Sequence, residues 1–304
     1  MNALLTEALQ AFGLKEATFV QQHENAVYRA DGHYLLRIHK AAEGLHADHD
    51  PALRSAELSL LTHLADAGMP VQRPLAETTL SDGTQATLLT WLEGRTLTRS
   101  DMPLELLQQA GELAFRLHQA AQGFRHNALR RYDAAHVLRL ADALAAMGTR
   151  HALNREEIAV ACAAARVIAD RLAGASGEFF AIHCDLSASN LLLTEQGLTV
   201  IDFSLCGAGH PMHDLGILLG NIGSQAERQA IAAGYAAAGG RIDLPLLDAG
   251  YTLGLLEALD FHADVWPQEP WFAPRLTRWV SEQLRPLAEG KPLLNEDMFL
   301  LNIK

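Results

Sequence analysis

Four polar residues in one largely apolar stretch of the sequence have the types and spacing of a chemical site. His183, Asp185 and Asn190 form the pattern His-x-Asp-x4-Asn, and Asp202 follows two short apolar runs joined by a turn. Carboxylate and amide oxygens are the hard ligands that suit Mg²⁺, and a carboxylate can also accept a proton. Each short pattern occurs by chance, but their order and separation together favour one functional site.

The whole segment, IHCDLSASNLLLTEQGLTVIDF at residues 182–203, resembles the catalytic and metal-binding loops of the aminoglycoside phosphotransferase and choline kinase family. That family belongs to the protein-kinase-like superfamily. The resemblance implies ATP- and Mg²⁺-dependent transfer of the γ-phosphoryl group to a hydroxyl of a small molecule, with GTP left open as an alternative donor. It implies Asn190 and Asp202 as metal ligands and Asp185 as the catalytic residue that orients the hydroxyl or accepts its proton.

Two further residues are expected to support this loop structurally. We expect His183 to be a buried residue that hydrogen-bonds the backbone near the metal-binding loop. The segment from His210 to Leu215 extends the resemblance, and Asp214 is expected to cap the helix that follows. Cys184 stands where the family usually has glycine, although no charge of the site is lost by this departure.

Upstream, the resemblance implies a cation and a glutamate that hold the phosphates in place. Arg37 and Glu57 occupy those positions, with arginine where the family often has lysine. The loop at residues 21–25 lacks the glycines typical of protein kinases, and Asn25 is its candidate phosphate contact. The segment around Thr90 and Leu92 resembles the hinge whose backbone would hydrogen-bond adenine.

The surrounding sequence predicts an α+β, protein-kinase-like bilobal fold, with a small β-rich N-lobe at residues 1–92 and a larger helical C-lobe at residues 93–304. Apolar periodicity predicts helices and strands on this plan. The helical patterns cover residues 2–12, 51–67, 103–121, 134–147, 155–173 and much of 213–287, and the strand patterns cover residues 26–29, 34–38, 72–77, 84–89, 179–182, 191–193 and 198–201.

The acceptor is expected to bind in the helical lobe, between about residues 120 and 160 and after residue 250. Glu257, Asp260, Trp266 and Trp271 combine carboxylates with aromatic rings, which could hold an amine through charge and cation-π contacts. An amphipathic helix with a proline-rich turn explains the same pattern equally well. Amino alcohols, sugars, aminoglycosides and hydroxy amino acids all remain open as acceptors.

Composition excludes several other classes. The formal charge of −12, from 24 Lys and Arg against 36 Asp and Glu, disfavours nucleic-acid binding. The three cysteines are far apart in sequence, and no apolar run approaches the roughly 20 residues that span a bilayer. We therefore expect a cytoplasmic protein without a membrane segment, while the oligomeric state stays open.

Three alternatives compete with a small-molecule kinase. A kinase acting on protein serine or threonine is disfavoured because only eleven residues separate Asp202 from Asp214, which is short for an activation segment. Arg37 and the glycine-poor loop suggest a nucleotide-binding pseudokinase with a regulatory role. A nucleotidyl transferase on the same fold is the third alternative. The presence of Asp185, Asn190 and Asp202 together argues against the last two.

Overall fold

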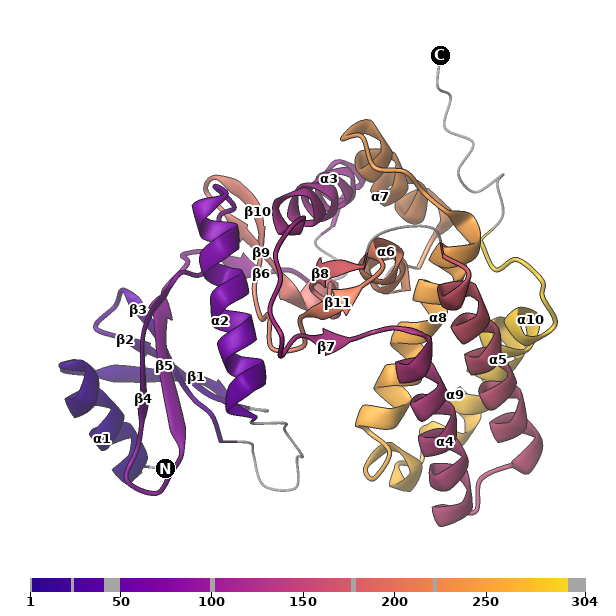
Figure 1. Ribbon diagram of the computed structural model, residues 1–304, viewed down its shortest axis with the longest axis horizontal. Coiled ribbons are helices and arrows are strands. Elements are labelled where there is room, and N and C mark those ends of the chain that lie inside the picture. The colour runs from indigo at the N-terminus through magenta and orange to yellow at the C-terminus, as the bar shows by residue number, and fades with distance from the viewer. Residues whose placement is uncertain are drawn as a thin grey trace.

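The chain folds into a smaller lobe built on an antiparallel sheet and a larger lobe built mainly of helices, as seen in a computed structural model (Figure 1). The predicted α+β, two-lobed fold is therefore confirmed. The structure describes residues 2–22, 25–40, 50–98, 102–175, 179–220 and 223–294.

The sheet of the smaller lobe has the strand order β1-β2-β3-β5-β4, with every neighbouring pair antiparallel. The turn between β2 and β3 contains Asp31 and Gly32 with φ of 45° and 74°, as the Asp-Gly pattern predicts. The strands are β1 (Ala17–Gln22), β2 (Ala26–Ala30), β3 (Tyr34–Ile38), β4 (Pro74–Thr79) and β5 (Gln85–Thr90).

Two helices cover opposite faces of this sheet, α1 (Asn2–Phe12) and α2 (Pro51–Asp66). Side chains alternate between the faces of a strand. On β3, Leu36 and Ile38 pack in one apolar cluster with α1, whereas Arg37 points to the other face and reaches α2. The helical amide groups at the start of α2 are capped by the Asp50 carboxylate, which accepts from Ala52 N at 2.8 Å. The alternation of side chains along β3 thus directs the Arg37 side chain toward α2.

The larger lobe packs its helices in pairs, of which α3 with α7, α4 with α5 and α6 with α8 are the most extensive. Glycines permit the closest approaches. A Cβ atom at Gly216 of α6 would lie 2.2 Å from Tyr251 N of α8, and one at Gly250 would lie 2.2 Å from Met212 O. The helices are α3 (Leu104–Ala121), α4 (Ala134–Arg150), α5 (Arg155–Ala173), α6 (Pro211–Gly220), α7 (Gln225–Ala237), α8 (Leu244–Phe261), α9 (Phe272–Trp279) and α10 (Arg285–Ala288).

Two small sheets lie where the lobes meet and carry the loops of the predicted site. Their strand orders are β10-β9-β6 and β7-β11-β8. The two- and three-residue strands β6, β7 and β11 escaped sequence prediction because so few residues show no periodicity. The elements are β6 (Arg95–Thr96), β7 (Arg130–Arg131), β8 (Phe180–Ile182), β9 (Leu191–Thr194), β10 (Gly197–Val200) and β11 (Gly207–Gly209), with short helical turns η2 (Ala188–Asn190), η3 (Trp266–Gln268) and the π-helix η4 (Val280–Leu284).

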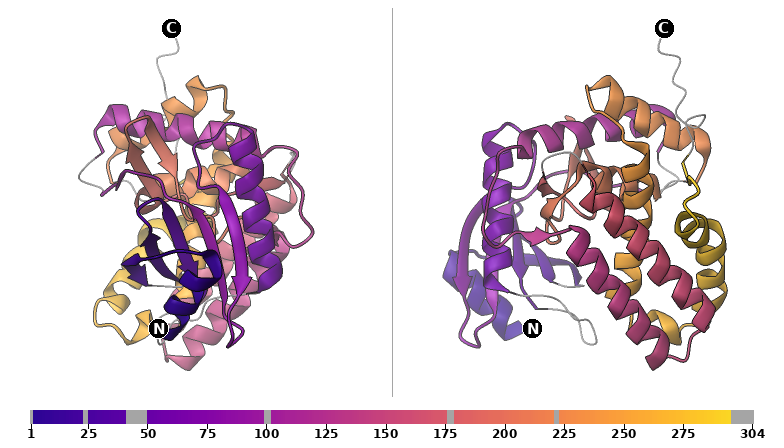
Figure 2. Two further views of the ribbon diagram at one scale, coloured as in Figure 1. Left: turned by 90° about the vertical axis from the view of Figure 1, so that its left-hand side faces the viewer. Right: turned by 45° about the vertical axis from the view of Figure 1, so that its right-hand side comes forward.

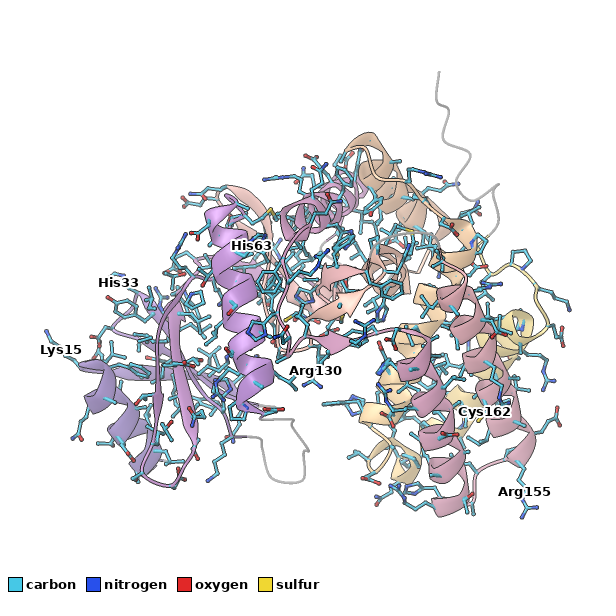
Figure 3. The ribbon with its side chains drawn as sticks, viewed as in Figure 1. Lys15, His33, His63, Arg130, Arg155 and Cys162 are labelled. Carbon is cyan, nitrogen blue, oxygen red and sulfur yellow. The ribbon has the colours of Figure 1, made fainter. Side chains whose placement is uncertain are left out.

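The helical pair α4 and α5 lies in the part of the larger lobe remote from the five-stranded sheet, as Figure 2 shows from two sides. Cys162 of α5 is buried in this bundle, far from Lys15 and His33 of the smaller lobe (Figure 3). The three cysteines are free thiols, as their separation in sequence predicted. Within the described ranges, no helix combines the length and apolarity needed to cross a membrane.

Candidate active site

The loop after β8 holds Asp185 and Asn190 side by side. The Asn190 amide nitrogen donates to Asp185 O at 2.8 Å and to Asp185 Oδ2 at 2.7 Å. Both partners are acceptors, so the amide is oriented with its nitrogen toward Asp185, and its oxygen is left for another ligand.

His183 connects this loop to the strand end that precedes Asp202. The fully buried His183 ring donates from Nε2 to Ile201 O at 3.0 Å, and its Nδ1 accepts from Asp185 N at 3.2 Å. Burial lowers the pKa of His183, which suits a neutral ring with its proton on Nε2. Ile201 N also donates to Asn190 O at 3.0 Å. The two loops are therefore joined at two points.

Asp214 lies in the first turn of α6, but it does not cap that helix as expected. Its carboxylate is fully buried and accepts from His183 N at 2.9 Å, from Cys184 N at 2.7 Å and from His118 Nε2 at 3.0 Å. Burial acts to raise the pKa of Asp214, yet the bond and charge of His118 and the proximity of His183 lower it overall. The carboxylate was misassigned because its partners are distant in sequence, two in a loop about 30 residues earlier and one on α3.

Two residues of the site have left-handed backbone conformations, Cys184 with φ of 66° and Asp202 with φ of 63°. Side-chain-bearing residues rarely adopt such values, and glycine adopts them readily. This explains why the family usually has glycine at the position of Cys184. Here the hydrogen bonds from the His183 and Cys184 backbone amides to Asp214 hold Cys184 in this conformation. A strained backbone conformation persists only where the surrounding structure enforces it.

Asn190 and Asp202 supply the donor set that a magnesium ion would need from the protein. The described residues contain no group of three His, Cys, Asp or Glu side chains placed to hold a metal. Mg²⁺ typically takes one or two protein oxygen ligands and completes its shell with phosphates and water. The Asn190 amide oxygen and the Asp202 carboxylate fit that role, while the cation would offset phosphate charge.

Arg37 of β3 and Glu57 of α2 form a buried ion pair, with Arg37 Nη2 donating to Glu57 Oε1 at 2.7 Å. Burial acts to lower the pKa of Arg37, but the charges of Glu57 and then Asp202 raise it overall. The guanidinium is therefore within electrostatic reach of Asp202. Its Nε has no hydrogen-bond acceptor among the described residues, which leaves a buried donor suited to an anionic ligand.

Removing Glu57 is expected to lower the free energy of unfolding by about 3–5 kcal/mol, because Glu57→Ala leaves the buried Arg37 unpaired. Urea unfolding measures this loss. The matched control is Asp66→Ala, which breaks the exposed Arg73–Asp66 pair of 2.7 Å and should cost about 0–1 kcal/mol. Equal losses in the two variants would contradict a structural ion pair at Arg37.

The hinge at residues 90–92 and the loop between β1 and β2 carry the remaining nucleotide contacts that the sequence predicted. Thr90 N donates to Arg73 O and Trp91 N to His33 O, each at 2.9 Å, so the hinge amides up to Trp91 are used within the protein. No described residue accepts from Leu92 N. Asn25 carries a buried side-chain oxygen without a described partner, whereas His23 and Glu24 of the predicted loop lie outside the described residues.

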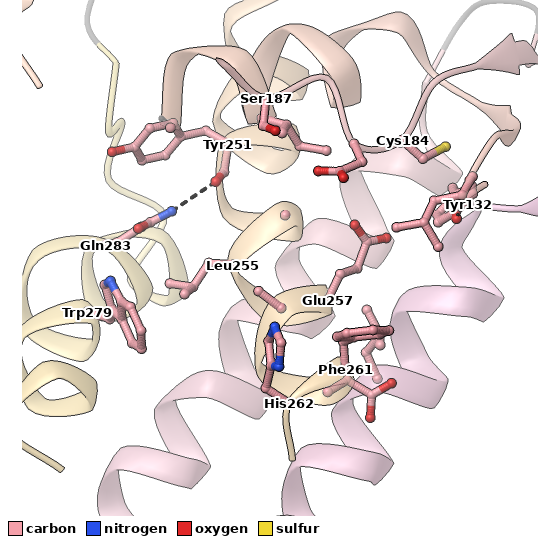
Figure 4. Close-up of a pocket in the computed structure, with 18 of the residues that line it drawn as sticks. Tyr132, Cys184, Ser187, Tyr251, Leu255, Glu257, Phe261, His262, Trp279 and Gln283 are labelled. Carbon is pink, nitrogen blue, oxygen red and sulfur yellow. Dashed lines mark hydrogen bonds between the residues drawn. The ribbon is translucent and has the colours of Figure 1, made fainter. Parts of the chain in front are cut away.

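A cavity of about 650 Å³ opens beside Asp185 in the larger lobe, and we refer to it as the C-lobe cavity. Figure 4 shows Glu257 between the loop of Cys184 and Ser187 and the end of α8 at His262. Glu257, Asp260 and Trp266 line the cavity, as do residues that the sequence did not single out, among them Tyr132, His136, Arg275, Trp279 and Gln283.

Trp271 does not belong to the C-lobe cavity, contrary to the sequence interpretation. Its side chain is 44% exposed and packs edge-on against Trp266, with ring centroids 5.4 Å apart. It precedes α9, whose cavity-facing side instead presents Arg275 and Trp279. Aromatic composition alone could not distinguish the two tryptophans, because the path of the turn before α9 decides which ring faces inward.

Glu257 bridges two histidines from different helices. His136 Nε2 of α4 donates to one carboxylate oxygen at 3.1 Å, and His213 Nε2 of α6 donates to the other at 2.9 Å. Burial acts to raise the pKa of Glu257, but His213 and then His136 lower it overall. For His213, burial acts to lower the pKa and Glu257 raises it overall. Both shifts favour the charged pair.

The stability of the fold should depend on pH through this pair. The folded pKa of His213 lies above its ordinary value of 6.5, so its contribution is complete below pH 6.5 and is lost as pH rises through the folded pKa. We expect the free energy of unfolding of His213→Gln not to show this decline as the pH rises. Urea unfolding from about pH 5.5 to about pH 9 measures both proteins, and parallel curves would contradict the pairing.

Comparison with known proteins agrees with this geometry. A family model described as the phosphotransferase enzyme family matches residues 17–253. A search of curated proteins finds no match. Among solved structures, the amicoumacin kinase hAmiN in complex with AMP-PNP, Ca²⁺ and Ami is similar with a TM-score of 0.71 and 16% identity, covering 96% of this chain and 94% of that chain.

Two further structures have the same architecture over nearly their whole length. The microcompartment-associated aminopropanol kinase has a TM-score of 0.67 and 21% identity, covering 94% of this chain and 96% of that chain. The ADP-bound aminoglycoside phosphotransferase APH(2'')-Ib has a TM-score of 0.66 and 15% identity, covering 98% and 99%. At these identities the likeness shows the fold, whereas the family model spans most of the sequence, and the chain belongs to the phosphotransferase enzyme family.

Proposed function

We propose that this protein is a small-molecule kinase that transfers the γ-phosphoryl group of ATP, or of GTP, to a hydroxyl of an acceptor bound in the C-lobe cavity. The observation that carries the proposal is the position of Asp185. This residue lines the cavity and is hydrogen-bonded to Asn190, while His183 joins its loop to the strand end before Asp202. One carboxylate thus borders the acceptor cavity and contacts Asn190, one of the two proposed metal ligands.

The reaction makes one P–O bond, breaks another and moves one proton. The acceptor hydroxyl oxygen attacks the γ-phosphorus, the bond from that phosphorus to the β–γ bridging oxygen breaks, and the hydroxyl proton passes to Asp185. The Asp185 carboxylate, whose Oδ2 also accepts from Asn190, is the proposed proton acceptor. When bound, Mg²⁺ would neutralise charge on the phosphate oxygens, and Asn190 and Asp202 are the residues proposed to hold it.

The smaller lobe supplies the proposed nucleotide contacts. Arg37, oriented by Glu57, would bind phosphate through its unpartnered Nε, and Asn25 would contribute from the loop before β2. At the hinge, the Leu92 amide is the proposed donor to adenine, and the Thr90 carbonyl is the proposed acceptor, because the Thr90 amide already donates to Arg73 O. We place the division between the lobes at residues 92 and 93.

The test is ADP release from ATP and Mg²⁺ over a panel of amino alcohols, sugars, aminoglycosides and hydroxy amino acids, with Asp185→Asn as the blank. Acceptor-dependent release that disappears in the blank supports the kinase. If ATP binds but no acceptor raises release above the blank, the pseudokinase with a regulatory role takes its place.

A further inference from the structure

The C-lobe cavity contains a positive charge that no acidic side chain of the described residues pairs with. Among the described residues that line the cavity, Arg275 supplies the one Lys or Arg side chain. Its guanidinium lies over the ring of Trp279, 5.4 Å from the centroid, and forms no ion pair with a described residue. Arg278, one turn later on the same helix, is instead paired with Glu282 at 2.9 Å and lies outside the cavity.

A carboxylate in the same cavity also has no ion-pair partner among the described residues. Glu257 has both oxygens engaged by His136 and His213. Asp260, one turn further along α8, lines the cavity and forms no ion pair within the described part of the chain. Burial raises the pKa of Asp260; the charge of His136 acts to lower it and that of Glu257 to raise it, and the pKa is raised overall.

Planar side chains form a stack along the cavity wall. His262, two residues after Asp260, stacks on Trp266 with centroids 4.2 Å apart and planes inclined by 14°. Trp266 stacks in turn on Trp279 at 6.0 Å, and Arg275 lies over the same Trp279 ring. Asp260 and Arg275 both line the cavity, and they do not pair with each other.

We infer that the acceptor is a zwitterion, a hydroxylated amino acid or short peptide whose ammonium group pairs with Asp260 and whose carboxylate pairs with Arg275. The inference rests on the proposed function and selects one acceptor class for it. Charged groups facing a partly enclosed space gain most from a ligand that brings the opposite charges. A guanidinium held flat by an aromatic ring is preorganised for a carboxylate, because less side-chain freedom is lost on binding.

The experiment uses acceptors in which either charge is removed at nearly constant size. Three parents place the ammonium and carboxylate at increasing separation: L-homoserine, L-seryl-glycine and L-seryl-diglycine. Each is compared with its C-terminal amide, which lacks the negative charge, and with its N-acetyl derivative, which lacks the positive one. For at least one parent, kcat/KM should exceed that of both derivatives by about tenfold to hundredfold.

The variants assign each charge to its residue. Arg275→Gln should abolish the preference for the parent over its amide, mainly through KM, and keep the preference over the N-acetyl derivative. Asp260→Asn should do the reverse. Arg278→Gln is the matched control on the same helix and should change neither preference.

Three results would overturn the inference: amides that equal their parents at every length, an Arg278→Gln effect equal to that of Arg275→Gln, or turnover confined to acceptors without a carboxylate. In the last case the kinase itself stands and only the acceptor class is wrong. Absence of turnover with the whole panel would instead reject the proposed function.

Discussion

Replacing Asp202 by alanine is expected to reduce Mg²⁺-dependent turnover by more than about 10³-fold, since the variant removes the one carboxylate proposed to hold the metal. The fold should persist. Asp202 has a left-handed backbone, in which alanine is disfavoured by about 1 kcal/mol, so a small loss of stability is expected alongside the large loss of activity. Steady-state ADP release and thermal unfolding measure the two effects separately.

Asp31→Ala is the matched control for the backbone effect. Asp31 also has a positive φ, 45°, but it lies in the turn between β2 and β3, where its carboxylate accepts from the Lys15 and Glu16 amides. This variant should lose stability and keep its turnover per folded molecule. If Asp202→Ala retains wild-type rates, or if both variants lose activity equally, Asp202 is not a metal ligand.

The second large effect is expected at Asp185. Asp185→Asn should lower kcat by about 10²- to 10⁴-fold, because a carboxamide cannot accept the proton of the acceptor hydroxyl. The loop should keep its shape, since the new amide oxygen can still accept the bond from Asn190 that now measures 2.7 Å. Nucleotide affinity should therefore stay within about twofold of the wild type, as measured by calorimetric titration.

A substitution elsewhere in the same loop separates chemistry from disturbance of the loop. Ser189 is exposed, and its hydroxyl forms a hydrogen bond of 2.8 Å with the Ser187 hydroxyl. Ser189→Ala should change kcat by less than about threefold, as expected for a surface substitution. Comparable kcat values for Asp185→Asn and the wild type would leave Asp185 with a structural role only.

The features that the sequence predicted well depend on neighbours in the chain. The strands around Asp31 and Gly32, the helix ending near Gly68 and the order His183, Asp185, Asn190, Asp202 are all local patterns, and the structure follows them. The pairing of Arg37 with Glu57 was expected from the resemblance to the family, and the structure contains this ion pair.

The acceptor side of the site was predicted only in outline. Tyr132 and His136 line the C-lobe cavity from one segment and Arg275 from another segment far along the chain, and nothing in the sequence indicates that the two segments converge. The partners of Asp214 and the orientation of Trp271 were missed because the first come from a distant loop and from α3, and the second depends on the path of the turn before α9. Tertiary packing determines both, and short-range periodicity does not specify it.

The close contact of α6 and α8 at Gly216 and Gly250 has a consequence for how such an enzyme could be redirected to new acceptors. Asp214 on α6 holds the catalytic loop, and Glu257 on α8 faces the cavity. Two helices in such contact move as one body, so reshaping α8 would disturb catalysis. Variation is better tolerated on α9 and the adjoining π-helix η4, which border the cavity through Arg275, Trp279 and Gln283, and laboratory evolution of acceptor preference should accumulate its substitutions there.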